Sequence, residues 1–331
     1  MTDPIGTRRS AHAPRPNGRN LSLGPVTQAT PRLGSPYSLV TRTAGYTWMR
    51  SVVAVLLALS IFLLLTPLVR DTVVALGWSI SGADTPYADY SSSASRFERP
   101  VGMLAANLGL AVLIPVSLLL TAMLYGLRQA WLFSVNGAIR WRYLLVCLAL
   151  AGVVLGGVAA VTVVVSATPL APQPHFWLFL LVILMTSPLQ AAAEEVFFRG
   201  FLLQALGSLV TNPWFGVVVS AAVFAFFHGG QNVPLFLSRL SFGLLAGALV
   251  LKTGGLEAAI GAHVVNNLLA YTVAGLTTGI AQARAIDQIT WTIAGIDVGG
   301  FALFAVAAWL VARRLKIDTV VTRANEANRP L

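Results

Sequence analysis

Long runs of apolar residues, separated by short polar segments, dominate the chain from about residue 46 onward. A run of about 20 apolar residues is long enough to cross the ~30 Å hydrocarbon core of a bilayer as a helix. Most of the runs approach this length, and they fall at about 46–68, 101–127, 144–167, 176–210, 214–228, 235–251, 256–276 and 295–312. The pattern therefore predicts an all-α, polytopic transmembrane helical bundle with about eight spanning helices.

The composition agrees with this class of protein. The chain has 331 residues, of which 56% are hydrophobic and 10% are charged, whereas soluble domains carry about 25% charged residues. The net charge of +10 does not indicate a nucleic-acid partner, because the basic residues flank apolar runs and suit contact with the lipid bilayer. The one cysteine, Cys147, excludes a disulfide within the chain and is expected to be a small core residue.

The organisation falls into four parts. Residues 1–44 are rich in Pro, Gly, Arg, Ser and Thr, which predicts a disordered basic cytoplasmic tail. Residues 45–172 hold three N-terminal transmembrane helices. Residues 173–276 form a helical core with unusual polar residues, and residues 277–331 form the last transmembrane helix and a cytoplasmic tail.

The loop charges predict how the chain is oriented. Lys and Arg concentrate before the first run and in every second loop, and such segments remain in the cytoplasm. Both termini are therefore expected to be cytoplasmic, which agrees with an even number of spans. The Arg-over-Lys, Ala- and Gly-rich composition favours a bacterial plasma membrane as the location.

Ionisable residues inside the apolar runs are the candidate functional groups, because charge at bilayer depth is costly and usually functional. They gather in three short pieces, which are Glu194-Glu195-Val-Phe-Phe-Arg199, Phe224-Ala-Phe-Phe-His228 and His263-Val-Val-Asn-Asn267. Helical spacing puts Glu195 and Arg199 on one face, where they can pair. The same spacing places His263 and Asn267 together, so three helices can direct these side chains toward one point.

Each piece has a simpler interpretation when taken alone. The glutamates and Arg199 suit a buried ion pair, and polar residues such as His228 often join membrane helices by hydrogen bonds. Three unrelated structural roles within one stretch that is poor in polar residues are less probable than a single functional site that uses all three pieces. Peptide hydrolysis needs such a set, since a carboxylate or imidazole takes a proton from water while donors stabilise the oxyanion.

The three motifs, in this order, resemble those of the CAAX protease and bacteriocin-processing (CPBP) family of intramembrane peptidases, over about residues 176–272. The resemblance implies an endopeptidase that cuts a membrane-associated protein or peptide. It implies that Glu194 and His228 activate water, that His263 and Asn267 stabilise the oxyanion, and that Glu195 and Arg199 orient Glu194.

A metal requirement stays open. Glu194, His228 and His263 are suitable ligand types for one divalent ion such as zinc, but the HExxH helix of other zinc peptidases is absent. The helix that ends at His228 must stop inside the bilayer if His228 is to reach His263. We therefore expect irregular backbone over residues 229–234, lining a wet cavity at membrane depth.

Two other functions use the same residues. One is a proton- or ion-coupled transporter, which would need a continuous polar path through other helices. The other is a non-catalytic membrane protein of the bacteriocin-immunity type, which differs from a peptidase only in activity. Nothing in the sequence indicates the oligomeric state.

Overall fold

The computed structural model describes residues 29–82, 84–210 and 212–322. Within these ranges the regular structure is helical, apart from three isolated β-bridges. The elements in chain order are η1 (Tyr37–Leu39), α1 (Trp48–Ser81), α2 (Tyr87–Ser95), α3 (Pro100–Ala111), α4 (Leu113–Tyr125), η2 (Gln129–Leu132), α5 (Trp141–Val165), α6 (Phe176–Glu194), the π-helix η3 (Glu195–Leu202), α7 (Leu203–Leu209), α8 (Pro213–Phe226), α9 (Val233–Thr253), α10 (Glu257–Leu276), α11 (Ile280–Arg284) and α12 (Trp291–Arg314). The predicted all-α bundle is confirmed.

Seven helical segments in the described residues are long and apolar enough to span a membrane. They are Trp48–Ser81, Pro100–Tyr125, Trp141–Val165, Phe176–Leu209, Val233–Thr253, Glu257–Leu276 and Trp291–Arg314. The remaining predicted span corresponds to α8, which has 14 residues. At 1.5 Å per residue α8 is about 21 Å long, too short to cross the bilayer by itself.

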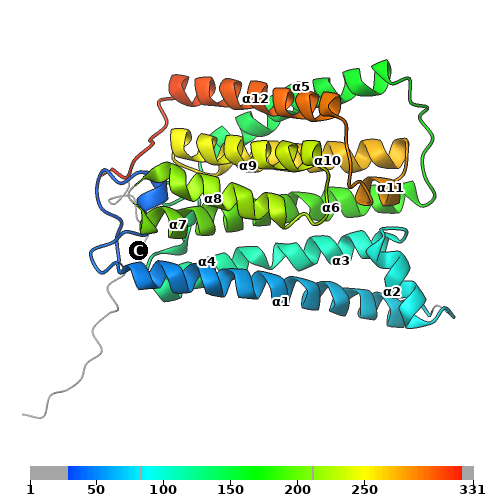
Figure 1. Cartoon of the computed structure of the whole chain (residues 1–331), viewed down its shortest axis with the longest axis horizontal. Helices are drawn as coiled ribbons and strands as arrows, with labels where there is room; N and C mark the ends of the chain where they lie inside the picture. Colours follow the sequence, from blue (N-terminus) through cyan, green and yellow to red (C-terminus); the bar gives the residue numbers. More distant parts are fainter. Residues whose placement is uncertain (1–28, 83, 211, 323–331) are drawn as a thin grey trace, which may run out of the picture.

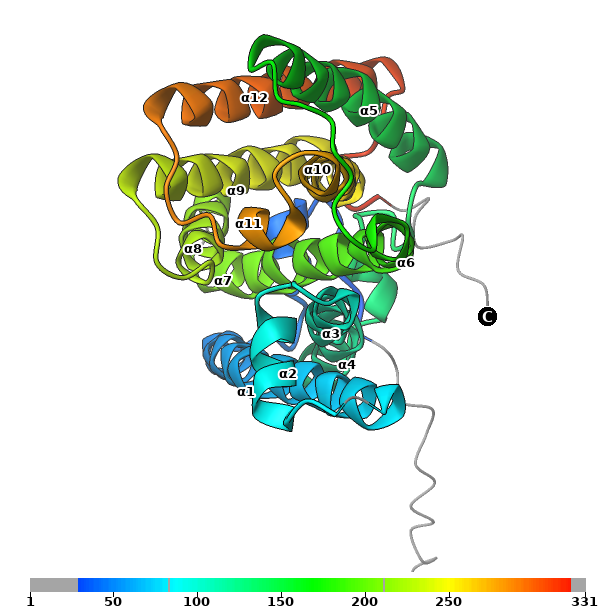
Figure 2. The ribbon, with the colours of Figure 1, turned by 90° about the vertical axis from the view of Figure 1, so that its right-hand side faces the viewer.

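The helices run roughly along one axis and stack in layers (Figures 1 and 2). The segment α1–α4 forms one side, α6–α10 form the middle, and α5 with α12 cover the opposite side. The contacts α1 with α3, α3 with α6, α6 with α10, and α10 with α5 connect these layers. The elements that carry the three motifs therefore lie in the interior of the bundle.

The two described ends of the chain meet at one end of the bundle, on the left of Figure 1. The N–H of Gly34 donates to the Val321 carbonyl at 2.9 Å, and the N–H of Val321 donates to the Ser35 carbonyl at 3.0 Å. We call this the terminal end. The α2–α3 and α11–α12 connections lie at the other end, which we call the distal end.

Residues 29–44 differ from the predicted disordered tail, because this segment packs against the bundle. Tyr37 is fully buried and donates to the Leu132 carbonyl, and burial raises the pKa of its hydroxyl well above the usual range. Thr41 and Arg42 donate to the carbonyls of Gln204 and Ser208 at 3.2 and 2.8 Å. The Ser208 carbonyl belongs to the last turn of α7, so Arg42 supplies a partner that a helix C-terminus lacks. The rest of the predicted tail, 1–28, lies outside the described residues.

Close helix contacts surround the core. A Cβ atom added at Gly261 of α10 would lie 3.0 Å from the Cβ of Cys147 on α5. Cys147 is a buried free thiol, so the prediction of a core residue is confirmed. At the start of α10, Glu257 accepts from the Nη2 and Nε of Arg140 at 2.6 and 2.9 Å. This bidentate pair fixes the α4–α5 connection to α10.

Candidate active site

The first motif lies where the helix widens from α to π geometry. Glu194 is the last residue of α6, and Glu195 opens the π-helix η3, whose eight residues are all buried. Such i→i+5 turns inside α-helices are rare and occur frequently at functional sites. The change in helical turn places the two adjacent glutamates in different surroundings.

Glu195 is fully buried and faces two partners. Its Oε1 accepts from Nη1 of Arg199 at 2.9 Å and from Nδ1 of His263 at 2.7 Å. The predicted pair between Glu195 and Arg199 is therefore confirmed. The guanidinium of Arg199 also lies 4.1 Å from the ring centroid of Phe224 and 5.2 Å from that of Phe242, so aromatic faces surround the buried cation.

Glu194 lies on the other side of the His263 ring. Its Oε2 is 3.4 Å from Nε2 of His263, and 8% of the residue is exposed, whereas Glu195 is 0% exposed. His263 thus stands between two carboxylates, with one facing each ring nitrogen. Of the two glutamates, Glu194 is the one that solvent reaches.

His228 follows the end of α8 and is fixed by its own helix. Its Nδ1 lies 2.8 Å from the Phe224 carbonyl. A carbonyl only accepts, so Nδ1 carries the proton and the neutral ring keeps Nε2 as a free acceptor. The Phe224 ring centroid lies 4.6 Å from that of His228 and 6.1 Å from that of His263. Phe224 therefore separates and packs against the two imidazoles.

Asn267 is held by a residue that the motifs do not include. Its Nδ2 donates to Oε1 of Gln190 at 2.9 Å, and its Oδ1 accepts from Nδ2 of Asn266 at 3.2 Å. Gln190 precedes Glu194 by four residues on α6, so both side chains lie on one helix face. The amide of Asn267 is oriented by these bonds beside Glu194.

One cavity of about 580 Å³ joins the motif residues. Glu194, His228, His263 and Asn267 line it, while Glu195 and Arg199 do not. The site therefore has two layers. Four side chains line the cavity, and the buried Glu195–Arg199 pair lies behind them. Irregular backbone at Gly229 and Gly230 also lines the cavity, as expected, but α9 already begins at Val233, so the predicted irregular segment is shorter. Whether it lies at membrane depth stays a prediction.

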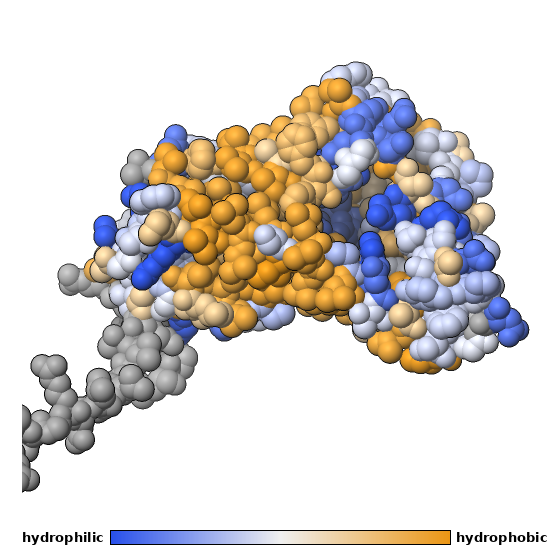
Figure 3. Space-filling model, turned by 60° about the horizontal axis from the view of Figure 1, so that its bottom comes forward, coloured by the Kyte–Doolittle hydropathy of each residue, from blue (hydrophilic) through white to orange (hydrophobic). Residues whose placement is uncertain are grey.

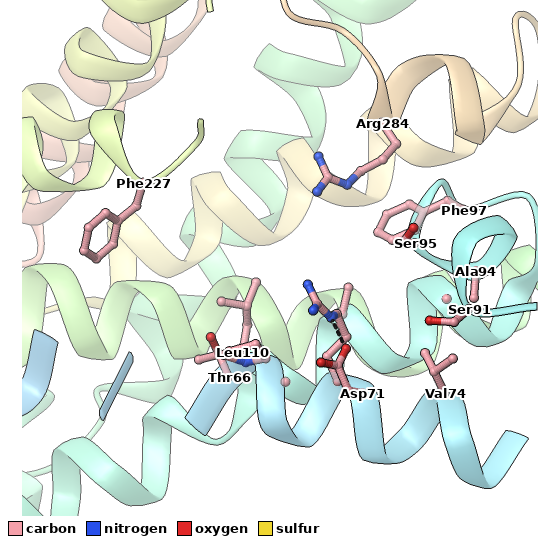
Figure 4. Close-up of a pocket in the computed structure, with 15 residues that line it drawn as sticks. Thr66, Asp71, Val74, Ser91, Ala94, Ser95, Phe97, Leu110, Phe227 and Arg284 are labelled. Atoms are coloured by element: carbon pink, nitrogen blue, oxygen red, sulfur yellow. Dashed lines mark hydrogen bonds and ion pairs between the residues drawn. The ribbon is translucent and has the colours of Figure 1, made fainter. Parts of the chain in front are cut away.

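The cavity extends toward the distal end. Phe97 of the α2–α3 connection and Asp287 of the α11–α12 connection line it. In Figure 3 a broad hydrophobic surface gives way to a hydrophilic end, and the surface is hollowed near the border. A second cavity of about 380 Å³ adjoins the first and shares Phe97, Phe227 and Arg284 with it. Figure 4 shows this second cavity between α1, which carries Thr66 and Asp71, and Arg284 of α11.

Neutral polar residues of the cavity were not predicted from the sequence. Asn107 of α3 lines the cavity and donates to Oγ1 of Thr186 at 2.8 Å. Tyr271 also lines the cavity, and it follows His263 and Asn267 at four-residue spacing on α10. The four-residue spacing of Tyr271 from Asn267, and of Gln190 from Glu194, could have indicated from the sequence that these residues share a helix face with the motif residues.

The described residues offer no ready metal centre. No group of three or more His, Cys, Asp or Glu side chains within them is placed to hold one ion. In the candidate set, His263 directs both ring nitrogens at glutamates, and His228 uses Nδ1 on a carbonyl. The side chains as placed do not fit a three-ligand zinc site, so the chemistry below is derived from the chain's own groups.

This fold and site define a polytopic helical membrane protein with a buried Glu–Arg–His cluster behind a polar cavity. Residues 175–269 match the model of the type II CAAX prenyl endopeptidase Rce1-like proteins, so this part of the chain is similar to that family. It is 37% identical over 98 residues to the uncharacterized protein YyaK of Bacillus subtilis (strain 168). That match covers 28% of this chain and 32% of YyaK. No solved structure matches the chain.

Proposed function

We propose that the chain is an intramembrane endopeptidase that hydrolyses a peptide bond in a membrane-associated protein or peptide. One observation carries the proposal, namely that Glu194, His228, His263 and Asn267 line a single cavity although three separate segments supply them. The match of residues 175–269 to the type II CAAX prenyl endopeptidase Rce1-like model supports the same reaction class.

Glu194 and His228 are the groups that activate water. Of the two glutamates, Glu194 is the one with an exposed fraction above zero. Nε2 of His228 is free to accept a hydrogen bond, because Nδ1 donates to the Phe224 carbonyl. A water molecule between them gives one proton to Glu194 as its oxygen attacks the scissile carbonyl carbon. Glu194 then returns that proton to the leaving amide nitrogen, so that the carbon–nitrogen bond breaks and the carboxylate is restored.

His263 and Asn267 stabilise the oxyanion of the tetrahedral intermediate. His263 is fixed through Nδ1 by Glu195, and its Nε2, which faces Glu194 at 3.4 Å, is the ring nitrogen that can donate to an oxyanion in the cavity. Asn267 adds a second donor, because one hydrogen of its Nδ2 is bound to Gln190 and the other is free to point at substrate. Donors that are already oriented contribute most to such stabilisation.

Glu195 and Arg199 are positioning residues. They lie behind the cavity, where Glu195 fixes Nδ1 of His263 at 2.7 Å and Arg199 neutralises Glu195 at 2.9 Å. This arrangement holds the imidazole in one orientation, as the buried aspartate does for the histidine of a serine protease triad.

The distribution of basic residues orients the site in the membrane. The described Lys and Arg residues at the terminal end are Arg32, Arg42, Arg50, Arg128, Arg140, Arg142, Lys252, Arg313, Arg314 and Lys316, against Arg70, Arg96, Arg99, Arg239 and Arg284 at the distal end. Because basic loops stay in the cytoplasm, the terminal end is cytoplasmic and the cavity opens on the other side. We place the chain in a bacterial plasma membrane, because its composition favours this location and a relative comes from Bacillus subtilis.

A cleavage assay tests the proposal. Purified chain in lipid nanodiscs is incubated with a quenched fluorescent peptide library, and wild type is compared with Glu194→Gln and His263→Ala. Loss of general-base chemistry lowers such rates by roughly 10²- to 10⁴-fold, so both variants should lose turnover. Glu98→Gln is the matched control, because Glu98 is an exposed acid at the same end of the molecule. Equal turnover in all four proteins, or none in wild type, contradicts the proposal.

A further inference from the structure

Asp297 is an acidic residue inside the last span, and it has no basic partner in the described part of the chain. Helix α12 begins at Trp291, so Asp297 lies about 9 Å along the helix from its distal start. No Lys, Arg or His side chain of the described residues lies within 4 Å of its carboxylate. Its polar neighbour is the hydroxyl of Ser238 on α9, which carries no charge.

Each of the other acids in the described spans has a basic side chain within 4 Å. The contacts are Asp71 with Arg70, Glu194 with His263, Glu195 with His263 and Arg199, and Glu257 with Arg140. Acids at membrane depth usually pair with a base or face a polar cavity, because an isolated charge is costly there. The described residues thus supply a base for each of these acids but none for Asp297.

Asp297 lines a groove of about 240 Å³ between α5, α10 and α12. Figure 2 shows α5 and α12 on the side of the bundle away from α1–α4, with α10 closer to the middle. The walls of the groove are mainly apolar and include Val158 of α5 and Val273 of α10. Two of its residues, Thr162 and Ala270, are exposed. Because all three helices are membrane spans, the groove opens to lipid.

The groove is separate from the cavity that holds the motif residues. The two share no lining residue, since Asn267 of α10 lines the cavity and Asn266 lines the groove. Nδ2 of Asn266 donates to Oδ1 of Asn267 at 3.2 Å, whereas no described donor binds Oδ1 of Asn266. The groove therefore offers a carboxylate and an amide oxygen that the proposed chemistry does not use.

These features are complementary to the side chain of a lysine or an arginine. Each has an apolar stem, which suits the walls around Val158 and Val273, and a cationic end, which suits Asp297 and Oδ1 of Asn266. Trp291 is exposed at the start of α12, as expected for a residue at the membrane interface. A lipid amine stays at that level, whereas a transmembrane helix can place a base about 9 Å below it.

A second copy of this chain is a poorer occupant than another protein. The Lys and Arg residues in the distal halves of the described spans are Arg70, which binds Asp71 at 2.8 Å, and Arg239, which lines the motif cavity. Neither is available to the groove of a neighbouring copy. The base has to come from a different membrane protein.

We propose that the groove between α5, α10 and α12 binds a transmembrane helix of a partner protein. The contact is one Lys or Arg of that helix, which pairs with Asp297 about 9 Å below the distal membrane interface. The partner is thus a membrane protein whose apolar span carries a base in its distal half. This inference does not depend on the peptidase function, because the groove and the cavity have no residue in common.

Designed helices test the pairing directly. Each is a Leu/Ala span with Trp at both ends and one guest residue, Lys, Gln or Glu, about 9 Å from one end. The full-length protein carries a donor dye at Val165→Cys, because Val165 is exposed at the distal end of α5 whereas Cys147 is buried. An acceptor dye is attached to the peptide end nearer the guest residue. Energy transfer in proteoliposomes then gives an apparent Kd as the peptide-to-lipid ratio rises.

The readout is the ratio of the Kd values for the Gln and Lys peptides, which does not depend on the folded fraction of a variant. Charge-assisted hydrogen bonds change affinity by roughly 10- to 100-fold. The parent protein should bind the Lys peptide at least about tenfold more tightly, and Asp297→Asn should bind both peptides equally. Asp297→Lys should instead prefer the Glu peptide. Asp71→Asn is the matched control, because Asp71 is an acid in the distal half of another span, and it should keep the preference for Lys.

Three results would overturn the proposal. The first is equal Kd values for the Lys and Gln peptides in the parent protein, or a preference for Lys that survives Asp297→Asn. The second is energy transfer between differently labelled copies of the parent protein that Asp297→Asn abolishes, which would assign the groove to self-association. The third is displacement of the Lys peptide by an equimolar amount of octadecylamine, which would assign the groove to a lipid amine. None of these results bears on the cleavage assay, so the peptidase function is tested independently.

Discussion

Replacement of Glu195 by glutamine tests how much the buried Glu195–Arg199 ion pair contributes to stability. Glutamine has nearly the same shape and keeps one oxygen, but it removes the charge that Arg199 and His263 both contact at 2.9 and 2.7 Å. Arg199 is 0% exposed, and its Nε and Nη2 have no hydrogen-bond partner among the described residues. Glu195→Gln therefore leaves a buried cation without its counterion.

The expected loss follows from this isolation. Breaking a buried ion pair by removing one partner costs about 3–5 kcal/mol. The contact of Arg199 with the Phe224 ring at 4.1 Å already exists in wild type, so it gives no new compensation. We therefore expect Glu195→Gln to lower the free energy of unfolding by about 3–5 kcal/mol.

A double-mutant cycle separates the pair from its surroundings. Arg199→Met removes the cation, and the double variant Glu195→Gln/Arg199→Met replaces the ion pair by neutral groups of similar size. Such replacements are often neutral or stabilising. The double variant should therefore be more stable than Glu195→Gln alone, with a coupling energy of about 2 kcal/mol or more.

Cys147 provides the assay. It is the chain's one cysteine and is buried in the fold, so a thiol-reactive dye reports unfolding as SDS is titrated into mixed micelles. Glu98→Gln, which breaks the exposed pair with Arg96, should leave the transition unchanged. A loss below about 1 kcal/mol for Glu195→Gln, or strict additivity in the cycle, would refute the reasoning.

Three further predictions use other parts of the fold. Gly102→Ala should abolish folded yield, because its Cβ would lie 1.8 Å from the Ala94 carbonyl oxygen, whereas Gly152→Ala meets nothing within 4 Å and should elute normally. In a cysteine-free background, a membrane-impermeant maleimide should label Asp287→Cys at the distal end in intact cells. It should label Arg314→Cys at the terminal end only after permeabilisation, and the reverse pattern would contradict the proposed orientation. Because no three ligand-type side chains converge in the described residues, EDTA and phenanthroline should leave cleavage unchanged, and a loss that zinc restores would contradict the metal-free mechanism.

Seven of the eight expected spans and the gathering of the motif residues were predictable, because charge is rare in this chain. Charged side chains inside apolar runs stand out, and helical spacing correctly paired Glu195 with Arg199. The end of the first helix was predicted less well. It continues from the expected end near Leu68 to Ser81. Arg70 and Asp71, which interrupt the apolar run, pair with each other on its surface at 2.8 Å.

Other features depend on contacts between residues far apart in the sequence. Thr41 is held by a bond to Gln204 of α7, more than 160 positions away, whereas the local composition indicated disorder there. Gln190 bonds Asn267 across 77 positions, and a neutral amide gives no signal of its partner. The apolar pattern also does not distinguish an i→i+5 turn from an i→i+4 turn, so the π-helix was not predicted.

The wide turn at Glu195–Leu202 bears on how such a site can arise in evolution. An i→i+5 turn encloses one residue more than an α-turn, so the insertion of a single codon into an ordinary membrane helix produces it. Deletion of one codon would restore the α-turn and rotate Glu194 by about 100° relative to α7. Homologues with almost the same composition can therefore differ in the presence of a working site through one small genomic event, which substitution-based comparisons would overlook.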